Sequence, residues 1–178
     1  MPNWACGPVT VTGTRDGLIS FIRRFPDGNA DEQRTGYFAR SFLFDDRQTL
    51  IEDIMMRTEA DPGNAVAEIT FSVSFAWSAY YCVISGYPEK WPDKCVTLSQ
   101  ACREDRVGVH IRTEEPGLYF EENILSDEDG NVTESSQDLK TARCPICGST
   151  QGTASFMDPA DLECFECGSV GLEWTKEV

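Results

Sequence analysis

The clearest chemical signal in this chain is a pair of C-x-x-C motifs near its C-terminus, C-P-I-C-G at 144–148 and C-F-E-C-G at 164–168. Each motif points two sulfurs at one spot, and its glycine lets the backbone fold back so that amides donate to the thiolates. Two such turns together supply four thiolates in a tetrahedron, an arrangement that suits Zn²⁺. The pattern therefore predicts a zinc ribbon with one structural Zn²⁺ per chain, held by Cys144, Cys147, Cys164 and Cys167.

Two reactive or disulfide-forming pairs are the alternative interpretation of these cysteines. A dithiol oxidoreductase normally needs a single C-x-x-C at the start of a helix that follows a strand, and neither pair has that context. The remaining cysteines, Cys6, Cys82, Cys95 and Cys102, are expected to be buried small apolar residues in a reducing compartment.

The elements that must position the cysteines follow from hydrophobic periodicity. Alternation predicts strands at 6–13, 37–44, 65–85 with a bend near Ser78, 107–111 and 118–124. Helices are expected after a cap at Thr14 or Asp16, after a cap at Asp45 or Asp46, and at 95–103. The sequence thus predicts an α+β domain at 1–125, an acidic linker at 126–142 and the zinc ribbon at 143–178.

The charge restricts the partners. The 178 residues carry 30 acids against 15 lysines and arginines, a formal net charge of −15. Nucleic-acid binding draws most of its affinity from basic residues at phosphates, so a protein partner is favoured over DNA or RNA. The stretch from Thr113 to Leu139 contains acids but no lysine or arginine. It is either a solvated hairpin edge followed by a linker or a negative recognition surface.

Three motifs in the first 125 residues resemble the YubB ferredoxin-like family, whose small members are carried largely by phages and plasmids. They are M-P-N-W with V-T-V-T-G at 9–13, F-A-W-S at 75–78 and E-P-G-L-Y-F at 115–120. The segment 79–94 looks inserted, and Gly7 stands where the family often has asparagine. The resemblance implies a ferredoxin-like antiparallel sheet with helices on one face, and it transfers no catalytic residues.

No catalytic constellation emerges from the sequence, so we expect a protein that is not an enzyme. The single histidine, His110, lies between Val109 and Ile111 and should face away from the core. Neither a nucleophile elbow nor a phosphate-binding glycine loop is present. Residues 127–131 lack the spacing of a calcium loop. Trp4 and Trp77 are expected in the core.

These patterns lead to one functional hypothesis and one alternative. The hypothesis is a non-enzymatic, zinc-containing protein-binding module of a mobile element, in one form an acidic mimic of nucleic acid that occupies a host protein. The alternative is a nucleic-acid-binding protein that uses the zinc ribbon. The N-terminus lacks a basic start before an apolar run, and no apolar stretch has the length of a membrane span. We therefore expect a cytoplasmic protein without membrane contact.

Overall fold

The computed structural model describes residues 3–26, 34–63 and 65–175. Within them the chain forms an α+β domain with a six-stranded antiparallel sheet, as expected, followed by a small three-stranded sheet. The elements of the first domain are β1 (Trp4–Thr14), α1 (Arg15–Ile22), β2 (Ser41–Leu43), α2 (Arg47–Arg57), β3 (Val66–Ala76), α3 (Ala79–Val83), α4 (Tyr87–Lys90), α5 (Leu98–Asp105), β4 (Val107–Glu115), β5 (Phe120–Ser126) and β6 (Val132–Asp138).

The predicted caps form as local chemistry dictates. The Thr14 side chain accepts from the amide of Gly17 at the start of α1, and Asp46 accepts from the amide of Thr49 at the start of α2. Thr97 starts α5 with a capping box. The strand predicted at 37–44 is shorter, because only Ser41–Leu43 pairs with β3.

The strand order of the large sheet is β2-β3-β1-β4-β5-β6, and all neighbours are antiparallel. The central strand β1 pairs with β3 along its whole length and with β4 on its other side. Strands β1 and β2 therefore run in the same direction with β3 between them. In the same way β3 and β4 run in the same direction with β1 between them.

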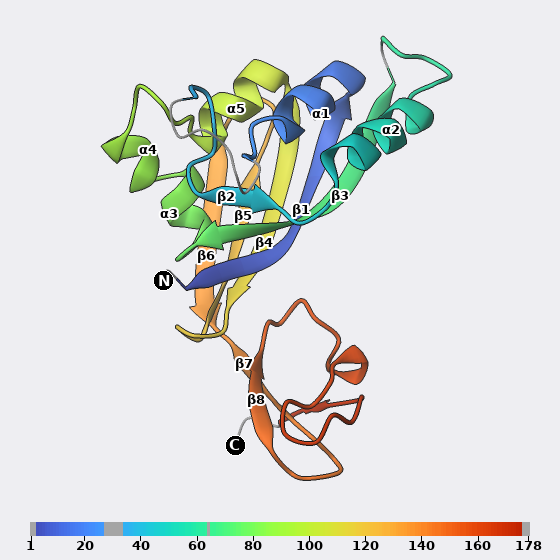
Figure 1. Ribbon diagram of the computed structural model, residues 1–178, viewed down its shortest axis with the longest axis vertical. Helices are drawn as coiled ribbons and strands as arrows, with labels where there is room; N and C mark the ends of the chain where they lie inside the picture. The colour runs from blue at the N-terminus through green and yellow to red at the C-terminus, as the bar shows by residue number, and fades with distance from the viewer. Residues whose placement is uncertain (1–2, 27–33, 64, 176–178) are drawn as a thin grey trace.

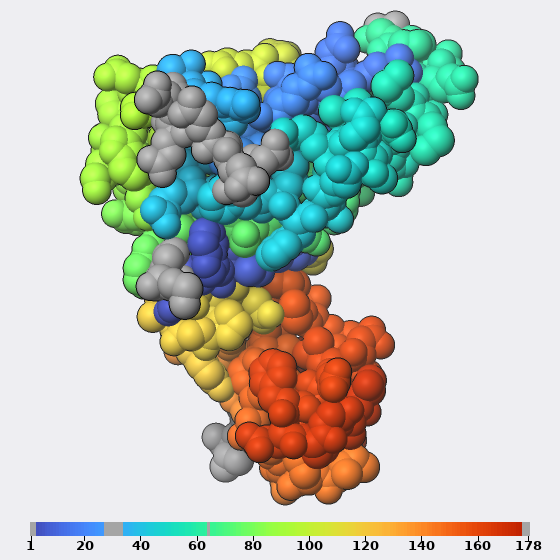
Figure 2. Space-filling view, viewed as in Figure 1, coloured from blue at the N-terminus to red at the C-terminus, as the bar shows by residue number. Residues whose placement is uncertain are grey.

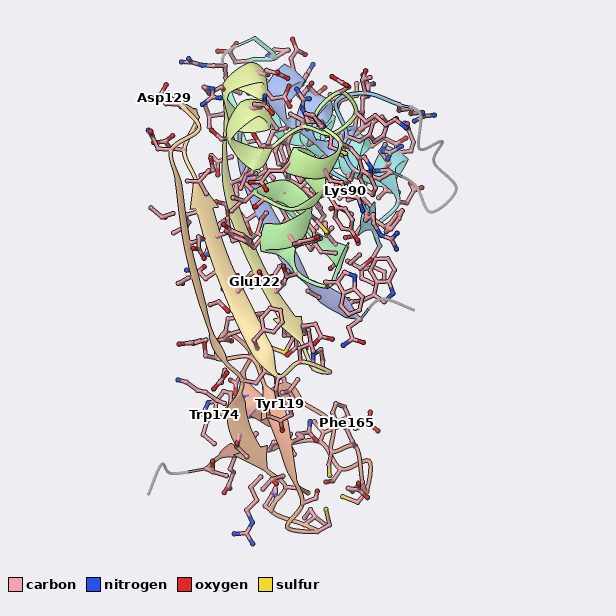
Figure 3. The ribbon with its side chains drawn as sticks, turned by 90° about the vertical axis from the view of Figure 1, so that its left-hand side faces the viewer. Lys90, Tyr119, Glu122, Asp129, Phe165 and Trp174 are labelled. Carbon is pink, nitrogen blue, oxygen red and sulfur yellow. The ribbon has the colours of Figure 1, made fainter. Side chains whose placement is uncertain are left out.

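The helices cover one face of the sheet. Helix α1 contacts both α2 and α5, and Figure 1 shows the three helices beside one another. The alternating side chains Val9, Val11, Val109 and Ile111 meet these helices in a core that also holds Phe21, Phe25, Phe38 and Phe75. We call the opposite side of the sheet the open face. Figure 3 shows the helices on one side of the strands only.

The C-terminal lobe comprises residues 140–175. It contains β7 (Lys140–Arg143), β8 (Thr150–Thr153), the 3₁₀ helix η1 (Pro159–Asp161) and β9 (Glu173–Trp174). Its strand order is β8-β7-β9. Figure 2 shows this lobe, in orange to red, below the α+β domain and in contact with it.

The structure corrects the predicted linker at 126–142. Residues Val132–Asp138 are strand β6, which pairs with β5 over seven consecutive positions. Asp127 closes the turn between them, since its carboxylate accepts from the amides of Asp129 and Asn131. Only Leu139 separates β6 from β7, so the chain passes from one sheet to the other almost directly.

Two tryptophans expected in the core are partly exposed, so that prediction was wrong. Trp4 packs edge-on against Phe42 at 5.7 Å, and Trp77 adopts a positive φ of 74° where the chain leaves β3. Of the cysteines outside the C-terminal lobe, Cys82 and Cys102 are buried and Cys6 and Cys95 are half-buried. Among the described residues, no helix is long and apolar enough to cross a membrane.

Candidate metal centre

The two C-x-x-C turns have the same backbone hydrogen bonds. In the first, the Gly148 amide donates to the Cys144 carbonyl at 3.0 Å, and the Cys144 amide donates to the Ser149 carbonyl at 2.8 Å. In the second, Gly168, Cys164 and Ser169 repeat these contacts at 2.9 and 2.8 Å. Two similar turns therefore face each other across the site.

A glycine is needed where each turn reverses. Gly148 has a φ of +77° and Gly168 a φ of +71°, values in the left-handed region that side chains with a Cβ rarely adopt. This left-handed step brings the chain back past its own cysteines. The glycine that follows each C-x-x-C motif thus has the role that its position in the sequence predicts.

The four sulfurs form a compact cluster of the predicted residues. One ligand atom from each of Cys144, Cys147, Cys164 and Cys167 lies within 4.8 Å of all the others. The sulfurs of Cys144 and Cys167 are 3.8 Å apart, and those of Cys147 and Cys164 are 3.7 Å apart. A tetrahedron with metal–sulfur bonds of about 2.3 Å has sulfur–sulfur edges of about 3.8 Å. The cluster has the size that a four-coordinate metal ion requires.

Two serines beside the cluster were missed by the sequence analysis. The Ser169 hydroxyl lies 3.1 Å from the sulfurs of both Cys144 and Cys167. The Ser149 hydroxyl lies 3.0 Å from the Cys147 sulfur and 3.1 Å from the Cys164 sulfur. The available signal was the full repeat C-x-x-C-G-S, which occurs at both turns.

Hydrogen bonding favours the thiolate form at Cys144 and Cys164, whereas the pKa of the Cys167 thiol is raised, because its bonds to Ser169 are outweighed by the neighbouring Cys147 and Cys164 thiols and by burial. The Ser169 hydroxyl, with further bonds that include the Cys147 amide, lowers the pKa of the Cys144 thiol from 9.0 to about 6. The Ser149 hydroxyl and the Cys167 amide lower the pKa of the Cys164 thiol. Because a thiolate and not a thiol binds the metal, these donors prepare the site for a cation.

Little apolar material supports the cluster. The buried residues around it are Ala142, Leu172, Cys144 and Cys164, with Leu162 packed against them. Cys147 and Cys167 are exposed. A core of this size is too small to fold a segment on its own.

Two carboxylates, one buried and one half-buried, attach the C-terminal lobe to the open face of the sheet. Glu121 on β5 is 4% exposed and accepts from the Ser155 amide, the Ser155 hydroxyl and the Gln137 side chain. On the neighbouring strand, Glu114 accepts from the Ala154 amide at 3.2 Å, and burial raises its pKa. The packing is close, because a Cβ on Gly152 would lie 2.6 Å from the Tyr119 ring.

Glu122 points to the opposite face and holds a helix start. Its carboxylate accepts from the amides of Ala79 at 2.7 Å and Tyr80 at 3.2 Å, in the first turn of α3. The Thr113 hydroxyl donates to the same group at 3.1 Å. Burial raises the pKa of Glu122 against the opposing effect of these donors. The expectation that the whole acidic stretch is solvated was therefore wrong for Glu115, Glu121 and Glu122, which are buried.

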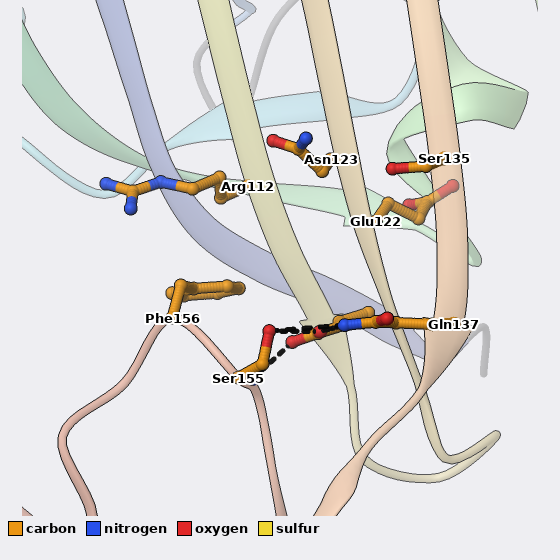
Figure 4. A pocket seen from close by; sticks show the side chains of 8 residues that line it. Arg112, Glu122, Asn123, Ser135, Gln137, Ser155 and Phe156 are labelled. Atoms are coloured by element: carbon orange, nitrogen blue, oxygen red, sulfur yellow. Dashed lines mark hydrogen bonds between the residues drawn. The ribbon is translucent and has the colours of Figure 1, made fainter.

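A polar pocket of about 260 Å³ lies where the C-terminal lobe meets the open face. Figure 4 shows Arg112 and Asn123 on the sheet and Phe156 and Ser155 on the lobe. The Arg112 guanidinium lies over the Phe156 ring at 5.4 Å from its centroid. The pocket offers donors and acceptors to a small polar group.

His110 faces away from the core, as predicted, because its neighbours Val109 and Ile111 are buried against the helices. Its Nε2 lies 2.5 Å from the Asn123 Oδ1. This contact is to an amide and not to a carboxylate or a nucleophile. His110 and the four cysteines are in separate parts of the structure.

When the chain is compared with protein families, with curated proteins and with solved structures, nothing matches. The resemblance to the YubB family therefore stays a prediction.

Proposed function

We propose that the four cysteines bind one structural Zn²⁺ and that the C-terminal lobe is a zinc ribbon. The proposal is supported by the chemistry of the donor set, four thiolates with tetrahedral spacing and hydroxyl and amide donors around them. Four protein ligands occupy every coordination position of a tetrahedral Zn²⁺, which is the pattern of structural zinc sites. When bound, the ion would join the two turns and replace the apolar core that the lobe lacks.

We infer a ferredoxin-like arrangement for strands β1 to β4. The supporting observation is their order, β2-β3-β1-β4, with α1 between β1 and β2 and α5 before β4. The pairs β1–β2 and β3–β4 are each parallel with one antiparallel strand between their members, so each is a split β-α-β unit. The connection from β2 to β3 contains α2 but joins adjacent antiparallel strands. Strands β5 and β6 then extend this sheet on one side.

For the molecule as a whole we propose a non-enzymatic module that binds another protein through acidic side chains. The observation that carries this proposal is the division of the acidic stretch. Glu115, Glu121 and Glu122 are buried, while Asp127, Glu128, Asp129, Glu134 and Asp138 are exposed on the β5–β6 hairpin. Exposed carboxylates grouped on one element steer a basic partner and discriminate against acidic ones.

Capture of a partner from a cell lysate tests the protein-binding proposal. The purified zinc-loaded protein is compared with a variant carrying Asp129→Asn, Glu134→Gln and Asp138→Asn. We expect the variant to lose the captured protein while its melting temperature stays nearly unchanged, because exposed carboxylates add little to stability. Equal capture by both proteins would contradict the proposal.

The alternative, nucleic-acid binding through the ribbon, predicts a different result. Affinity for DNA or RNA would then fall steeply with salt, since basic side chains would replace the counterions at phosphates. An anisotropy titration with labelled single- and double-stranded oligonucleotides decides between the two functions. Lack of binding at low ionic strength eliminates the alternative.

A further inference from the structure

Strand β6 is a long edge of the large sheet that lacks lysine, proline and a bulge. It is last in the strand order, so its outer side has no hydrogen-bonded neighbour among the described strands. Residues 133–138 are all exposed. Natural edge strands are commonly blunted by charged side chains, above all lysine, by proline, by a bulge or by short length. This one is seven residues long and pairs with β5 without interruption; it contains the acids Glu134 and Asp138 but neither lysine nor proline.

The pairing with β5 fixes which backbone groups are free. At its two ends the Asp127 amide donates to the Asn131 carbonyl and the Leu139 amide donates to the Tyr119 carbonyl. In an antiparallel ladder hydrogen-bonded pairs alternate with non-bonded pairs, so the odd-numbered residues of β6 point their backbone groups to β5. The amides and carbonyls of Glu134, Ser136 and Asp138 therefore point outward from the sheet.

The charge along this edge has one sign. Glu134 and Asp138 lie two positions on either side of Ser136, on one face of the strand. Asp129 lies in the turn at one end, as Figure 3 shows. Two basic side chains lie beside the turn: Arg106, which is 3.8 Å from Glu128, and Arg103, whose Cγ would lie 2.9 Å from a Cβ on Gly130. A second copy of the chain would bring equal charges together, whereas an incoming basic segment would neutralise them.

We propose that β6 binds an extended basic segment of a partner protein as a seventh strand. The proposal rests on the proposed protein-binding function and specifies its partner. Backbone bonds to residues 134, 136 and 138 provide the affinity, and lysines at alternate positions of the incoming strand lie beside Glu134 and Asp138. The selection is thus for an extended, positively charged chain.

A labelled peptide of sequence Lys-Val-Lys-Thr-Lys-Val-Lys, with both ends blocked, is the probe for this proposal. Its control is the same peptide with the backbone amide of every residue N-methylated, which has the same charge but cannot donate backbone hydrogen bonds to β6. The matched protein variants are Ser136→Pro, which removes one outward amide, and Ser136→Ala, which keeps it. Binding is measured by anisotropy at low ionic strength with zinc-loaded protein.

We expect the first peptide to bind the wild type and Ser136→Ala equally, and to bind Ser136→Pro about tenfold more weakly. Amide exchange followed by NMR should show new protection at Glu134, Ser136 and Asp138 in the wild type. This measurement needs no variant, so it decides the matter even if Ser136→Pro does not fold. Residues 133, 135 and 137 serve as internal controls, because β5 already protects their amides.

Four results would overturn strand addition. They are absence of binding by the lysine–valine peptide, equal binding of the N-methylated peptide, equal binding by the two Ser136 variants, and unchanged exchange at the three outward amides. If the triple variant Asp129→Asn, Glu134→Gln, Asp138→Asn loses a partner captured from lysate and Ser136→Pro retains it, the protein-binding proposal is supported and only strand addition is refuted. Self-association that Ser136→Pro abolishes would assign the edge to a second copy instead.

Discussion

Glu121 offers a direct test of how the C-terminal lobe is attached. Its buried carboxylate accepts from the Ser155 amide, the Ser155 hydroxyl and the Gln137 side chain. In Glu121→Gln one oxygen becomes an NH₂ group, which then faces at least one of these donors. A hydrogen bond to a charged group contributes about 1.5–3 kcal/mol, and a buried donor left unpaired costs about 1–3 kcal/mol. We expect the free energy of unfolding to fall by about 2–3 kcal/mol.

The assay is thermal unfolding of the zinc-loaded protein, with amide exchange at Ser155 as a local readout. For a chain of this length, about 1 kcal/mol corresponds to about 2–4 °C, so a decrease of roughly 4–12 °C is expected. Glu128→Gln is the matched control. It makes the same chemical change at an exposed side chain whose ion pair with Arg106 is 3.8 Å long, and it should leave the melting temperature nearly unchanged.

Equal melting temperatures for Glu121→Gln and Glu128→Gln would refute this reasoning. Slow exchange at Ser155 in Glu121→Gln would refute it as well, because the anchor would then be dispensable. A loss of protection confined to 140–175, with the sheet unaffected, would locate the effect at the attachment of the lobe.

Three further predictions concern the metal, a turn and a buried acid. Purified protein should contain about one zinc per chain by elemental analysis, and Cys147→Ser should lose the metal and the dispersed amide NMR signals of 140–175 but not those of the sheet. Gly130→Ala should lower the melting temperature by several degrees, because Gly130 has a φ of +78° and a Cβ would lie 2.4 Å from the Ser99 carbonyl oxygen; an unchanged value would contradict that placement. Carbon-13 NMR should give the Glu122 carboxyl a pKa above its ordinary 4.5. The contribution of this group to the free energy of unfolding therefore falls as the pH rises from 4.5 through the folded-state pKa. A titration midpoint of Glu122 at or below pH 4.5 would contradict its burial.

Much of the large sheet was predictable, because its signals are local. Alternation of Val9 and Val11 with threonines identified β1, and Thr14 and Asp46 are caps by their side-chain chemistry alone. The four clustered cysteines were predictable for the same reason, since two short motifs contain them. Their assembly into one cluster needed only a short connecting segment.

Strand β6 could not be predicted from periodicity. Both of its faces are polar, so the sequence T-E-S-S-Q-D lacks the alternation that marks a half-buried strand. Its position is determined by pairing with β5 and by the turn at Gly130, which are contacts made outside the strand itself. A polar segment between two folded units has the composition of a linker whether or not it pairs.

The burial of Glu121 and Glu122 could not be predicted from the sequence for a related reason, since it depends on segments that are distant in the chain. Adjacent residues on a strand point to opposite faces, and solvent was expected on at least one of them. Instead the start of α3 covers one face and the loop at Ser155 covers the other, so each carboxylate meets backbone amides that lack other acceptors. From composition alone these acids are assigned to the surface, but in the structure their carboxylates accept hydrogen bonds from backbone amides and hold two segments in place. Within the acidic stretch 113–139, the fully exposed carboxylates therefore lie on the β5–β6 hairpin, beside the free backbone edge of β6. In the proposed strand addition, charge and edge would act on the same partner, because a basic chain that approaches these carboxylates would also meet the outward amides of that strand.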